Sequence, residues 1–501
     1  MAHGTAGKAD IVAPRSPFYH GPFGRICPDL DPWTPPLGDN AGEREITAHF
    51  LQMANTLMVE FPDGQPPNET SEAVTKLSSK IPAAYTYFGQ FIDHDITFDP
   101  ASSLMRQNDP AGLMNHRTPR FDLDNVYGRG PDDSPYLYDQ REDQKGKLLL
   151  GEIADTKFPD LPRNAQGRAL IGDMRNDENA IVSQLQLSFL KAHNTLVDRA
   201  ITRKFADPFE KARMSLRWLY QYIVWNDFVR RVTKAEIFDS AFEKQMFPMG
   251  RTVWKPGMKD VFHWKNQPYM PVEFSVAAYR FGHSMVRNAY QTNNPVRGFG
   301  DFAPLFDKAT PDNDLRGFGP IKIQNAIQWD WFLQMESSAG PFPQHTRKID
   351  SKLANALMQL PNEPVPMNVL GFRNLLRGWR FSLPSGTSVA RKYCLPPMDI
   401  DPKHDSLWYY VLKEAETQEG GETLGALGST IVCAVFSGLL LGDPTSYVNI
   451  APCWTPDDDP LLEAGDKRDA KDWTLASIIR IAGMPASDSD FTMMMKSGKI
   501  D

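Results

Sequence analysis

The sequence predicts one large, mainly α-helical domain with few short strands and long loops. Several long segments repeat apolar residues at the spacing of an amphipathic helix, whereas the alternation typical of strands is scarce. The chain has 501 residues, of which 41% are hydrophobic, and this is enough for a large buried core. The stretches 98–135 and 291–328 are long and rich in Gly, Pro, Asp and Asn, which is typical of functional loops in a compact domain.

The predicted elements begin after a proline-rich stretch. Residues 1–40 predict an arm that wraps the surface, because their prolines break any helix, and the domain then spans 41–501. Apolar spacing predicts helices over 71–98, 180–206, 208–235, 272–289, 352–360, 368–379, 387–393, 406–416 and 423–441. The most apolar stretch, 426–441, is shorter than the roughly 20 residues that a membrane span needs. We therefore expect it to form a buried helix.

The composition favours a small-molecule partner. A net charge of −8 without a long basic run argues against nucleic acid and against an anionic membrane surface. The four cysteines, Cys27, Cys394, Cys433 and Cys453, are too scattered for a disulfide framework or a zinc site. Residues 1–25 lack the continuous apolar core of a secretory signal, so we expect a cytoplasmic protein or one secreted without a leader.

The first candidate site lies in the apolar and aromatic run 85–98. On a helix, Gln90 and His94 share a face, and Asp93 and Asp95 are turned roughly 100° to either side of His94. Burying a carboxylate costs roughly several kcal/mol of folding free energy unless it is hydrogen-bonded, ion-paired or coordinated to a metal. The alternative is a half-buried helix whose acids face water and whose histidine is hydrogen-bonded in the core.

The second cluster places Arg175 and Glu178 directly before the helix that runs on to His193. At i and i+3 these two side chains can face one pocket, although such a pair is more often solvated. The third cluster is the apolar segment that presents Arg280 and His283 on one face. A lone histidine there is more often a core residue than a ligand.

Two more features complete the pattern. Gly282 leaves room for a bulky planar neighbour close to the backbone beside the third cluster. The loop 118–128 offers oxygen donors at alternating positions, and Ca²⁺ takes six to eight such ligands. Alternating Asp residues occur in many loops, so the loop by itself is a weak signal.

Together these strings resemble the haem peroxidases of the animal type, in the peroxidase–cyclooxygenase superfamily, and look most like its bacterial members. The resemblance covers about residues 70–445. It implies that haem b is bound and that Nε2 of His283 is the axial ligand of the iron. Asn374 would hold the other ring nitrogen of that histidine, and Arg280 and Arg377 would neutralise the haem propionates.

The resemblance also implies a reaction. His94 would shuttle a proton between the two oxygens of hydrogen peroxide, with Gln90 beside it, and Arg175 would stabilise the developing negative charge. An oxyferryl intermediate would then oxidise halides, thiocyanate or small phenolic and aromatic donors, a chemistry typical of a response to oxidative stress. His193 would be structural and bond nearby backbone.

Two further ligand sets follow from the resemblance alone. Asp93 and Glu178 match the carboxylates that form ester bonds to haem methyl groups, whereas Asn179 stands where a methionine would give a sulfonium link. A structural calcium ion would be bound by Asp95 and by four residues of the loop. These are Thr118, Asp122 and Asp124 through their side chains and Arg120 through its carbonyl.

Three alternatives remain open at this point. A haem-dependent fatty-acid dioxygenase of the same superfamily needs a tyrosine three residues before the proximal histidine, but Arg280 stands there and Tyr279 lies one residue further away. An inactive scaffold or adhesion module would bind no haem. A non-haem metalloenzyme built on His94 and Asp95 lacks a second histidine at i+3 or i+4. Motif spacing specifies neither the physiological donor nor the oligomeric state.

Overall fold

The computed structural model describes residues 23–38, 41–64, 66–98, 114–247, 252–265, 267–307, 313–335, 342–361, 363–467 and 472–499. Helices account for 46% of the structure and strands for 10%. The predicted fold class, a mainly helical domain with few short strands, is therefore confirmed.

The bounds of the elements are as follows. The α-helices are α1 (Glu43–Thr56), α2 (Glu72–Lys76), α3 (Ala84–Ile96), α4 (Asp124–Tyr127), α5 (Ala180–Thr202), α6 (Pro208–Ile223), α7 (Arg230–Val232), α8 (Ala235–Ser240), α9 (Leu370–Arg380), α10 (Gly386–Lys392), α11 (Leu407–Glu419), α12 (Ala426–Gly442), α13 (Tyr447–Ile450), α14 (Leu475–Ile481) and α15 (Asp488–Ser497). The strands are β1 (Phe23–Gly24), β2 (Ser78–Pro82), β3 (Gly151–Glu152), β4 (Pro159–Asp160), β5 (Phe242–Met246), β6 (Thr252–Pro256), β7 (Met270–Pro271), β8 (Ala289–Tyr290), β9 (Ala303–Pro304) and β10 (His345–Arg347). Among the described residues they form the parallel pair β1–β7 and the antiparallel pairs β2–β10, β3–β4, β5–β6 and β8–β9.

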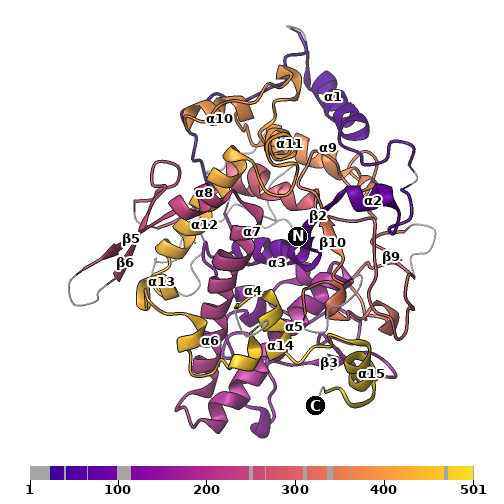
Figure 1. Ribbon diagram of the computed structural model, residues 1–501, viewed down its shortest axis with the longest axis vertical. Coiled ribbons are helices and arrows are strands. Elements are labelled where there is room, and N and C mark those ends of the chain that lie inside the picture. The colour runs from indigo at the N-terminus through magenta and orange to yellow at the C-terminus, as the bar shows by residue number, and fades with distance from the viewer. Residues whose placement is uncertain are drawn as a thin grey trace.

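Helix α3 lies in the middle of the molecule, with α9 and α11 above it and α5 and α6 below it in the view of Figure 1. Ten of the 13 residues of α3 are buried, including His94 and Asp95. Its Phe91 stacks on Phe189 of α5 with ring centroids 4.4 Å apart, and both rings contact the edge of Tyr220 from α6. This aromatic packing fixes the helix that carries His94.

The single helix predicted over 71–98 is wrong in its first half. The chain there forms α2, then strand β2, and only then α3. Strand β2 pairs with β10, and the hydroxyls of Ser79 and Thr346 are hydrogen-bonded across the pair at 2.7 Å. Pro82 disfavours helix in the residue before it, so pairing with a distant strand prevails over the local apolar spacing.

The helix predicted over 272–289 is also shorter than expected. A π-helical turn, η8 (Glu273–Ala277), leads into a 3-10 helix, η9 (Ala278–His283), which ends at the histidine. The carboxylate of Glu273 is buried and accepts hydrogen bonds from the backbone N–H groups of Ile26 and Cys27, both at 3.1 Å. Beyond His283 the chain turns into β8, so the helix cannot continue.

The segment predicted over 352–360 forms one 3-10 turn, η12 (Asn355–Met358), rather than a helix. The helices that were not predicted are α1, α4, α8, α13, α14 and α15. The remaining predicted helices correspond to α5, α6 with its π-helical continuation η6 (Val224–Val229) and α7, α9, α10, α11 and α12. Among the described residues, no helix combines the length and apolar character that crossing a membrane requires. Helix α12 is buried, as expected.

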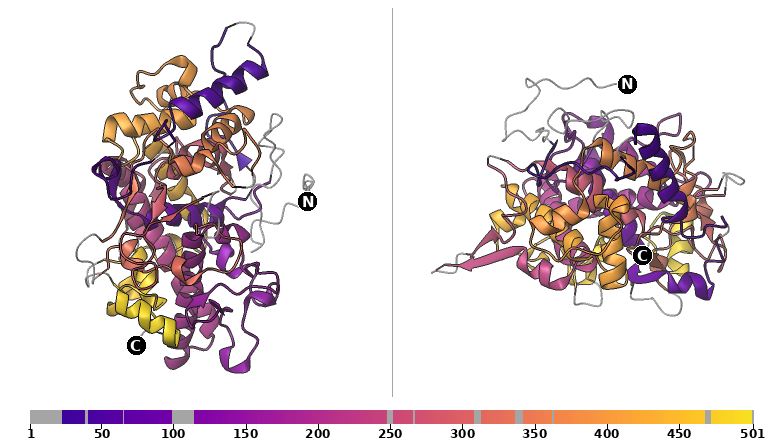
Figure 2. Two further views of the ribbon diagram at one scale, coloured as in Figure 1. Left: turned by 90° about the vertical axis from the view of Figure 1, so that its right-hand side faces the viewer. Right: turned by 90° about the horizontal axis from the view of Figure 1, so that it is seen from above.

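The described part of the proline-rich arm lies against the domain. Strand β1 pairs with β7, and the backbone N–H of Trp33 donates to the carbonyl of Leu383 at 2.8 Å. Residues 1–22 of the predicted arm lie outside the described residues. On another side of the molecule the β5–β6 hairpin projects away from the helices, as Figures 1 and 2 show.

Candidate functional site

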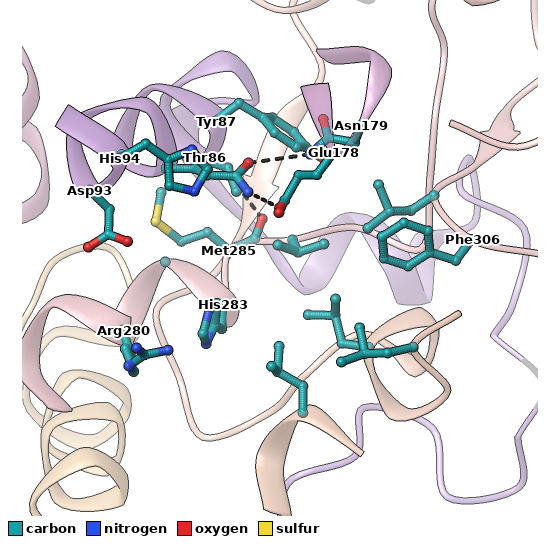
Figure 3. A pocket seen from close by; sticks show the side chains of 18 of the residues that line it. Thr86, Tyr87, Asp93, His94, Glu178, Asn179, Arg280, His283, Met285 and Phe306 are labelled. Carbon is teal, nitrogen blue, oxygen red and sulfur yellow. Dashed lines mark hydrogen bonds between the residues drawn. The ribbon is translucent and has the colours of Figure 1, made fainter. Parts of the chain in front are cut away.

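A cavity of about 650 Å³ lies between α3 and the η8–η9 segment. His94 enters it from α3 and His283 enters it from η9 on the opposite wall (Figure 3). The predicted site residues that line it are Gln90, Asp93, His94, Glu178, Arg280, His283, Asn374 and Arg377. Residues that are up to 287 positions apart in the sequence, from Gln90 to Arg377, therefore share one cavity.

The ring of His94 is held by a buried amide. Its Nδ1 lies 2.6 Å from Oδ1 of Asn176, in the 3-10 turn η5 (Met174–Asp177). The amide nitrogen of Asn176 donates to Oε1 of Gln186 at 2.8 Å, which identifies the atom facing the ring as the oxygen. Burial, and after it the charge of Arg175, lowers the pKa of His94 to about 4. The imidazole is therefore neutral near pH 7, with its proton on Nδ1.

The other polar groups on the α3 side are paired with one another. Gln90 donates from Nε2 to Oε1 of Glu178 and accepts from Nδ2 of Asn179 at 3.3 Å (Figure 3). Burial raises the pKa of Glu178 to about 7, although the bond from Gln90 opposes this rise. Asp93 accepts from the hydroxyl of Thr97 at 2.9 Å. Both carboxyl groups predicted to form esters thus line the cavity.

Arg175 does not line the cavity, in contrast to the shared pocket predicted for it and Glu178. Its guanidinium is paired with Asp173 at 2.7 Å and donates to the carbonyls of His94 and Thr97 at 3.0 and 2.7 Å. It also lies over the ring of Phe98, 4.6 Å from the centroid. Asp173 caps the turn η5 and is ion-paired with Arg175, which places the guanidinium at the C-terminal end of α3. The positive charge of Arg175 therefore acts on His94 from outside the cavity.

His283 is held from the other side of the cavity. Its Nδ1 lies 2.8 Å from Nδ2 of Asn374, and Oδ1 of that amide accepts from Arg280 at 3.4 Å. Burial, then the charges of Arg280 and Arg373, lower the pKa of His283 to about 3, so the ring is neutral. As placed, the NH₂ group of Asn374 donates to Nδ1 of His283. Metal binding through Nε2 would need the proton on Nδ1, and the amide would then turn over to present its oxygen and would lose the long bond from Arg280.

The cavity fits a planar group that carries carboxylates. A Cβ atom at Gly282 would meet nothing within 4 Å, so the wall beside His283 opens onto free space. Apolar side chains cover much of the remaining wall, among them Met285, Val286, Leu305, Phe306, Leu357, Leu360 and Leu370. Arg280, Arg373 and Arg377 supply positive charge at the same cavity. A neutral histidine, an apolar slot and arginines are together the surroundings that haem requires.

Three acidic side chains form a cluster that includes Asp95, the residue after His94. Carboxylate oxygens of Asp95, Asp122 and Asp124 lie within 4.8 Å of one another. Oδ1 of Asp95 and Oδ1 of Asp122 are buried without a hydrogen-bond partner, whereas Oδ1 of Asp124 is ion-paired with Arg117 at 3.2 Å. Burial raises the pKa values of all three carboxyl groups, that of Asp124 to about 8 although Arg117 opposes the rise. The negative charge of Asp122 adds to the rise at Asp95 and Asp124. The hydroxyl of Thr118 donates to Asp122 at 2.6 Å. Orphaned carboxylate oxygens of this kind fit a cation such as Ca²⁺.

Of the predicted calcium ligands, Asp95, Thr118, Asp122 and Asp124 thus come together. For Arg120 the structure gives a backbone N–H that donates to the carbonyl of Thr118 at 2.8 Å. His193 is structural, as expected, because it bonds the backbone carbonyl of Gly146 at 2.9 Å.

Sequence reasoning missed two kinds of residue. Asn176 and Gln186 hold His94, but no motif quoted from the sequence connects them with it. Tyr279 also lines the cavity, and its hydroxyl donates to the carbonyl of Gly89 at 3.1 Å. Only the adjacency of Asn176 to Arg175 in one string could have suggested a role.

Known proteins share both sequence and fold with this chain. Residues 102–312 match the family model described as animal haem peroxidase. A peroxidase-like protein from Margaritifera margaritifera is 26% identical over 315 residues, which are 52% of this chain and 35% of that protein. The match thus spans about a third of the length of this curated relative.

Two solved structures are similar over most of the chain. Peroxidase A from Dictyostelium discoideum has a TM-score of 0.59 at 14% identity, covering 92% of this chain and 94% of its own. Fatty acid alpha-dioxygenase from Oryza sativa has a TM-score of 0.55 at 16% identity, covering 95% and 81%. At such identities the likeness concerns the fold. The resemblance recognised from the motifs is thereby confirmed: residues 102–312 match the animal haem peroxidase family model, and the chain shares its fold with a peroxidase and with a fatty acid alpha-dioxygenase.

Proposed function

We propose that this protein is a haem peroxidase that reduces hydrogen peroxide and oxidises halides, thiocyanate or small aromatic donors. The observation that carries this proposal is the pair of neutral histidines on opposite walls of one cavity, each held at Nδ1 by an asparagine. The match of residues 102–312 to the animal haem peroxidase family supports it.

In this proposal His283 would bind the haem iron through Nε2, and Oδ1 of Asn374 would accept the Nδ1 proton after the amide has turned over. Arg280 and Arg377 neutralise the propionates. When bound, haem would supply the redox-active iron that the reduction of peroxide and the oxidation of a donor need. The ester links of haem to Asp93 and Glu178 belong to the same proposal, since both carboxyl groups line the cavity. Acid extraction tests them, because ester-linked haem stays with the polypeptide in its intact mass and free haem does not.

His94 moves the proton. Its unprotonated Nε2 takes the proton from the peroxide oxygen that lies nearer His283. It then returns this proton to the other oxygen, which leaves as water. Such general acid–base catalysis is typically worth about 10²–10⁴-fold in rate. Arg175 contributes through its charge, which adds to the effect of burial in lowering the pKa of His94, and through its bonds to the carbonyls at the end of α3. Gln90 orders the wall beside the histidine through its bond to Glu178.

We also propose that the cluster of Asp95, Asp122 and Asp124, with Thr118 and the carbonyl of Arg120, binds a structural Ca²⁺. Asp95 directly follows His94, so the cation would fix the end of α3 from the side away from the cavity. The buried oxygens without hydrogen-bond partners support this proposal.

A fatty-acid dioxygenase is the second candidate function. The apolar side chains of the cavity favour it, as does the fold shared with the rice fatty acid alpha-dioxygenase, whereas Tyr279, which also lines the cavity, lies four rather than three residues before His283. The two functions differ in their co-substrate, which is peroxide for the first and dioxygen for the second.

Parallel assays of the haem-loaded protein separate the two candidates. Oxidation of bromide, iodide or a phenol that depends on peroxide, and that Tyr279→Phe retains, is the result we expect. Oxygen uptake with a long-chain fatty acid, lost in Tyr279→Phe, would instead assign the dioxygenase. A protein that binds no haem and performs neither reaction would be left as a scaffold or adhesion module.

A further inference from the structure

We infer that Asn176 and Gln186 are positioning residues that fix the tautomer of His94, through a one-way chain of hydrogen bonds anchored on the carbonyl of Asn125. This inference deepens the proposed function and rests on it, since the tautomer decides which ring nitrogen can take a proton from peroxide.

The chain has three bonds. Nδ1 of His94 lies 2.6 Å from Oδ1 of Asn176. Nδ2 of Asn176 donates to Oε1 of Gln186 at 2.8 Å, and Nε2 of Gln186 donates to the backbone carbonyl of Asn125 at 3.1 Å. The side chains of Asn176, Gln186 and Asn125 are fully buried. Water therefore does not replace any of these bonds, and each broken one would leave a buried polar group unpaired.

The direction of the chain follows from its last member. A backbone carbonyl only accepts, so Gln186 must present its NH₂ group to Asn125 and its oxygen to Asn176. Asn176 must then donate to Gln186 and present its own oxygen to the histidine. Nδ1 of His94 consequently carries the proton, and the lone pair lies on Nε2. One carbonyl thereby determines the tautomer of a ring that is three hydrogen bonds away.

The carbonyl at the end of the chain belongs to Asn125, in the loop 118–128. Asn125 lies in α4, directly after Asp124, and its side-chain Nδ2 donates to the carbonyl of Phe91 in α3 at 3.2 Å. Asn125 therefore makes two contacts that bear on His94. Its side chain bonds helix α3, which carries the histidine, and its carbonyl accepts the last bond of the chain that orients the ring. This connection is independent of whether a cation is bound.

Helix α5 offers a matched control for Gln186. Gln184 is a second buried glutamine two positions earlier, and its side chain bonds the backbone at Ala180, Asn325 and Ile327 rather than Asn176. Gln184→Met and Gln186→Met each remove one buried amide from the same helix. Only the second interrupts the chain to His94.

The test is the protonation of the His94 ring, read by long-range ¹H–¹⁵N correlation spectra of the full chain labelled at histidine. Spectra are taken of the protein as purified and of its diamagnetic ferrous carbon monoxide complex, and His94→Gln assigns the resonance. We expect the proton on Nδ1 in the wild type, in Gln184→Met and in Asn176→Asp, which still accepts from Nδ1. Asn176→Leu and Gln186→Met should shift it to Nε2 or to a mixture.

The rate of reaction with peroxide gives the second readout. Asn176→Leu and Gln186→Met should lower it by roughly 10–100-fold, the usual cost of losing an orienting partner, whereas Gln184→Met should retain it. A wild-type proton on Nε2, or a tautomer unchanged in both Asn176→Leu and Gln186→Met, would overturn the inference even if the protein is a good peroxidase. A correct tautomer in a protein inert to peroxide would overturn the proposed function and leave the hydrogen-bond chain standing.

Discussion

Gln90 and Glu178 are hydrogen-bonded to each other along the wall of the cavity, with Nε2 of Gln90 donating to Oε1 of Glu178. The bond links α3, which carries Gln90 and His94, to the segment between η5 and α5, which carries Glu178. It also stabilises a carboxylate that is otherwise expensive to bury, and this has a measurable effect on stability.

Stability should fall as the pH rises through the titration of Glu178. Its pKa is about 7 in the folded protein, above its ordinary value of 4.5, because of burial. The folded state therefore binds this proton more tightly than the unfolded state, and the difference, about 3 kcal/mol, is lost between pH 4.5 and pH 7. Urea unfolding of the protein without haem at pH 5 and pH 8 measures it.

Glu178→Gln removes the titrating group, so the loss of stability between the two pH values should become smaller by that amount. The exposed Glu243→Gln in β5 is the control and should behave as the wild type does. An equal pH dependence in Glu178→Gln and the wild type would contradict the burial argument.

His283→Ala should lose haem. Its neutral ring faces the cavity from the wall opposite His94, and loss of its Nε2 removes the proposed ligand of the iron. The absorbance ratio of the Soret band to the protein band measures the haem content. His263→Ala, at an exposed position, should retain it, and full haem content in His283→Ala would remove this residue as the ligand.

His94→Ala should keep haem but react slowly. Without Nε2 no base moves the proton between the peroxide oxygens, and the second-order rate constant should fall by about 10²–10⁴-fold. Stopped-flow absorption after mixing with peroxide gives the constant. If the variant matched the wild type, His94 would have no part in the reaction.

Removing calcium should destabilise the protein. A cation present at 100 times its dissociation constant contributes about 2.7 kcal/mol to the folded state. A chelator should therefore lower the melting temperature of the wild type, and Asp122→Asn should lower it even without a chelator. Asp155→Asn, at an exposed turn, serves as the control. A melting temperature that is indifferent to both the chelator and Asp122→Asn speaks against a cation at this cluster.

The residues facing the cavity were the most predictable part of the site. His94 and His283 each lie in a short motif of polar residues within an apolar segment. Such a motif can be recognised in the sequence before the fold is known. The mainly helical class was predictable as well, since long apolar periodicity specifies helices. In contrast, β2 could not be predicted, because its pairing with β10 joins residues that are 263 to 269 positions apart in the sequence.

The orientation of side chains was less predictable than their presence. Spacing suggested that Arg175 and Glu178 share a face, but the bonds of Asp173 to the turn pull the arginine away. The partners of His94 come from η5 and α5, so they become visible only once three segments are packed. Local patterns carry no information about which buried amides meet.

The absorption spectrum of the haem-loaded protein, before and after one equivalent of hydrogen peroxide, tests the central claim most directly. The account predicts a Soret band that changes promptly on addition of peroxide and is restored by bromide, iodide or a phenol. A Soret band indifferent to peroxide, or no haem binding at all, would contradict the claim that His94 and His283 form the two sides of a peroxidase site.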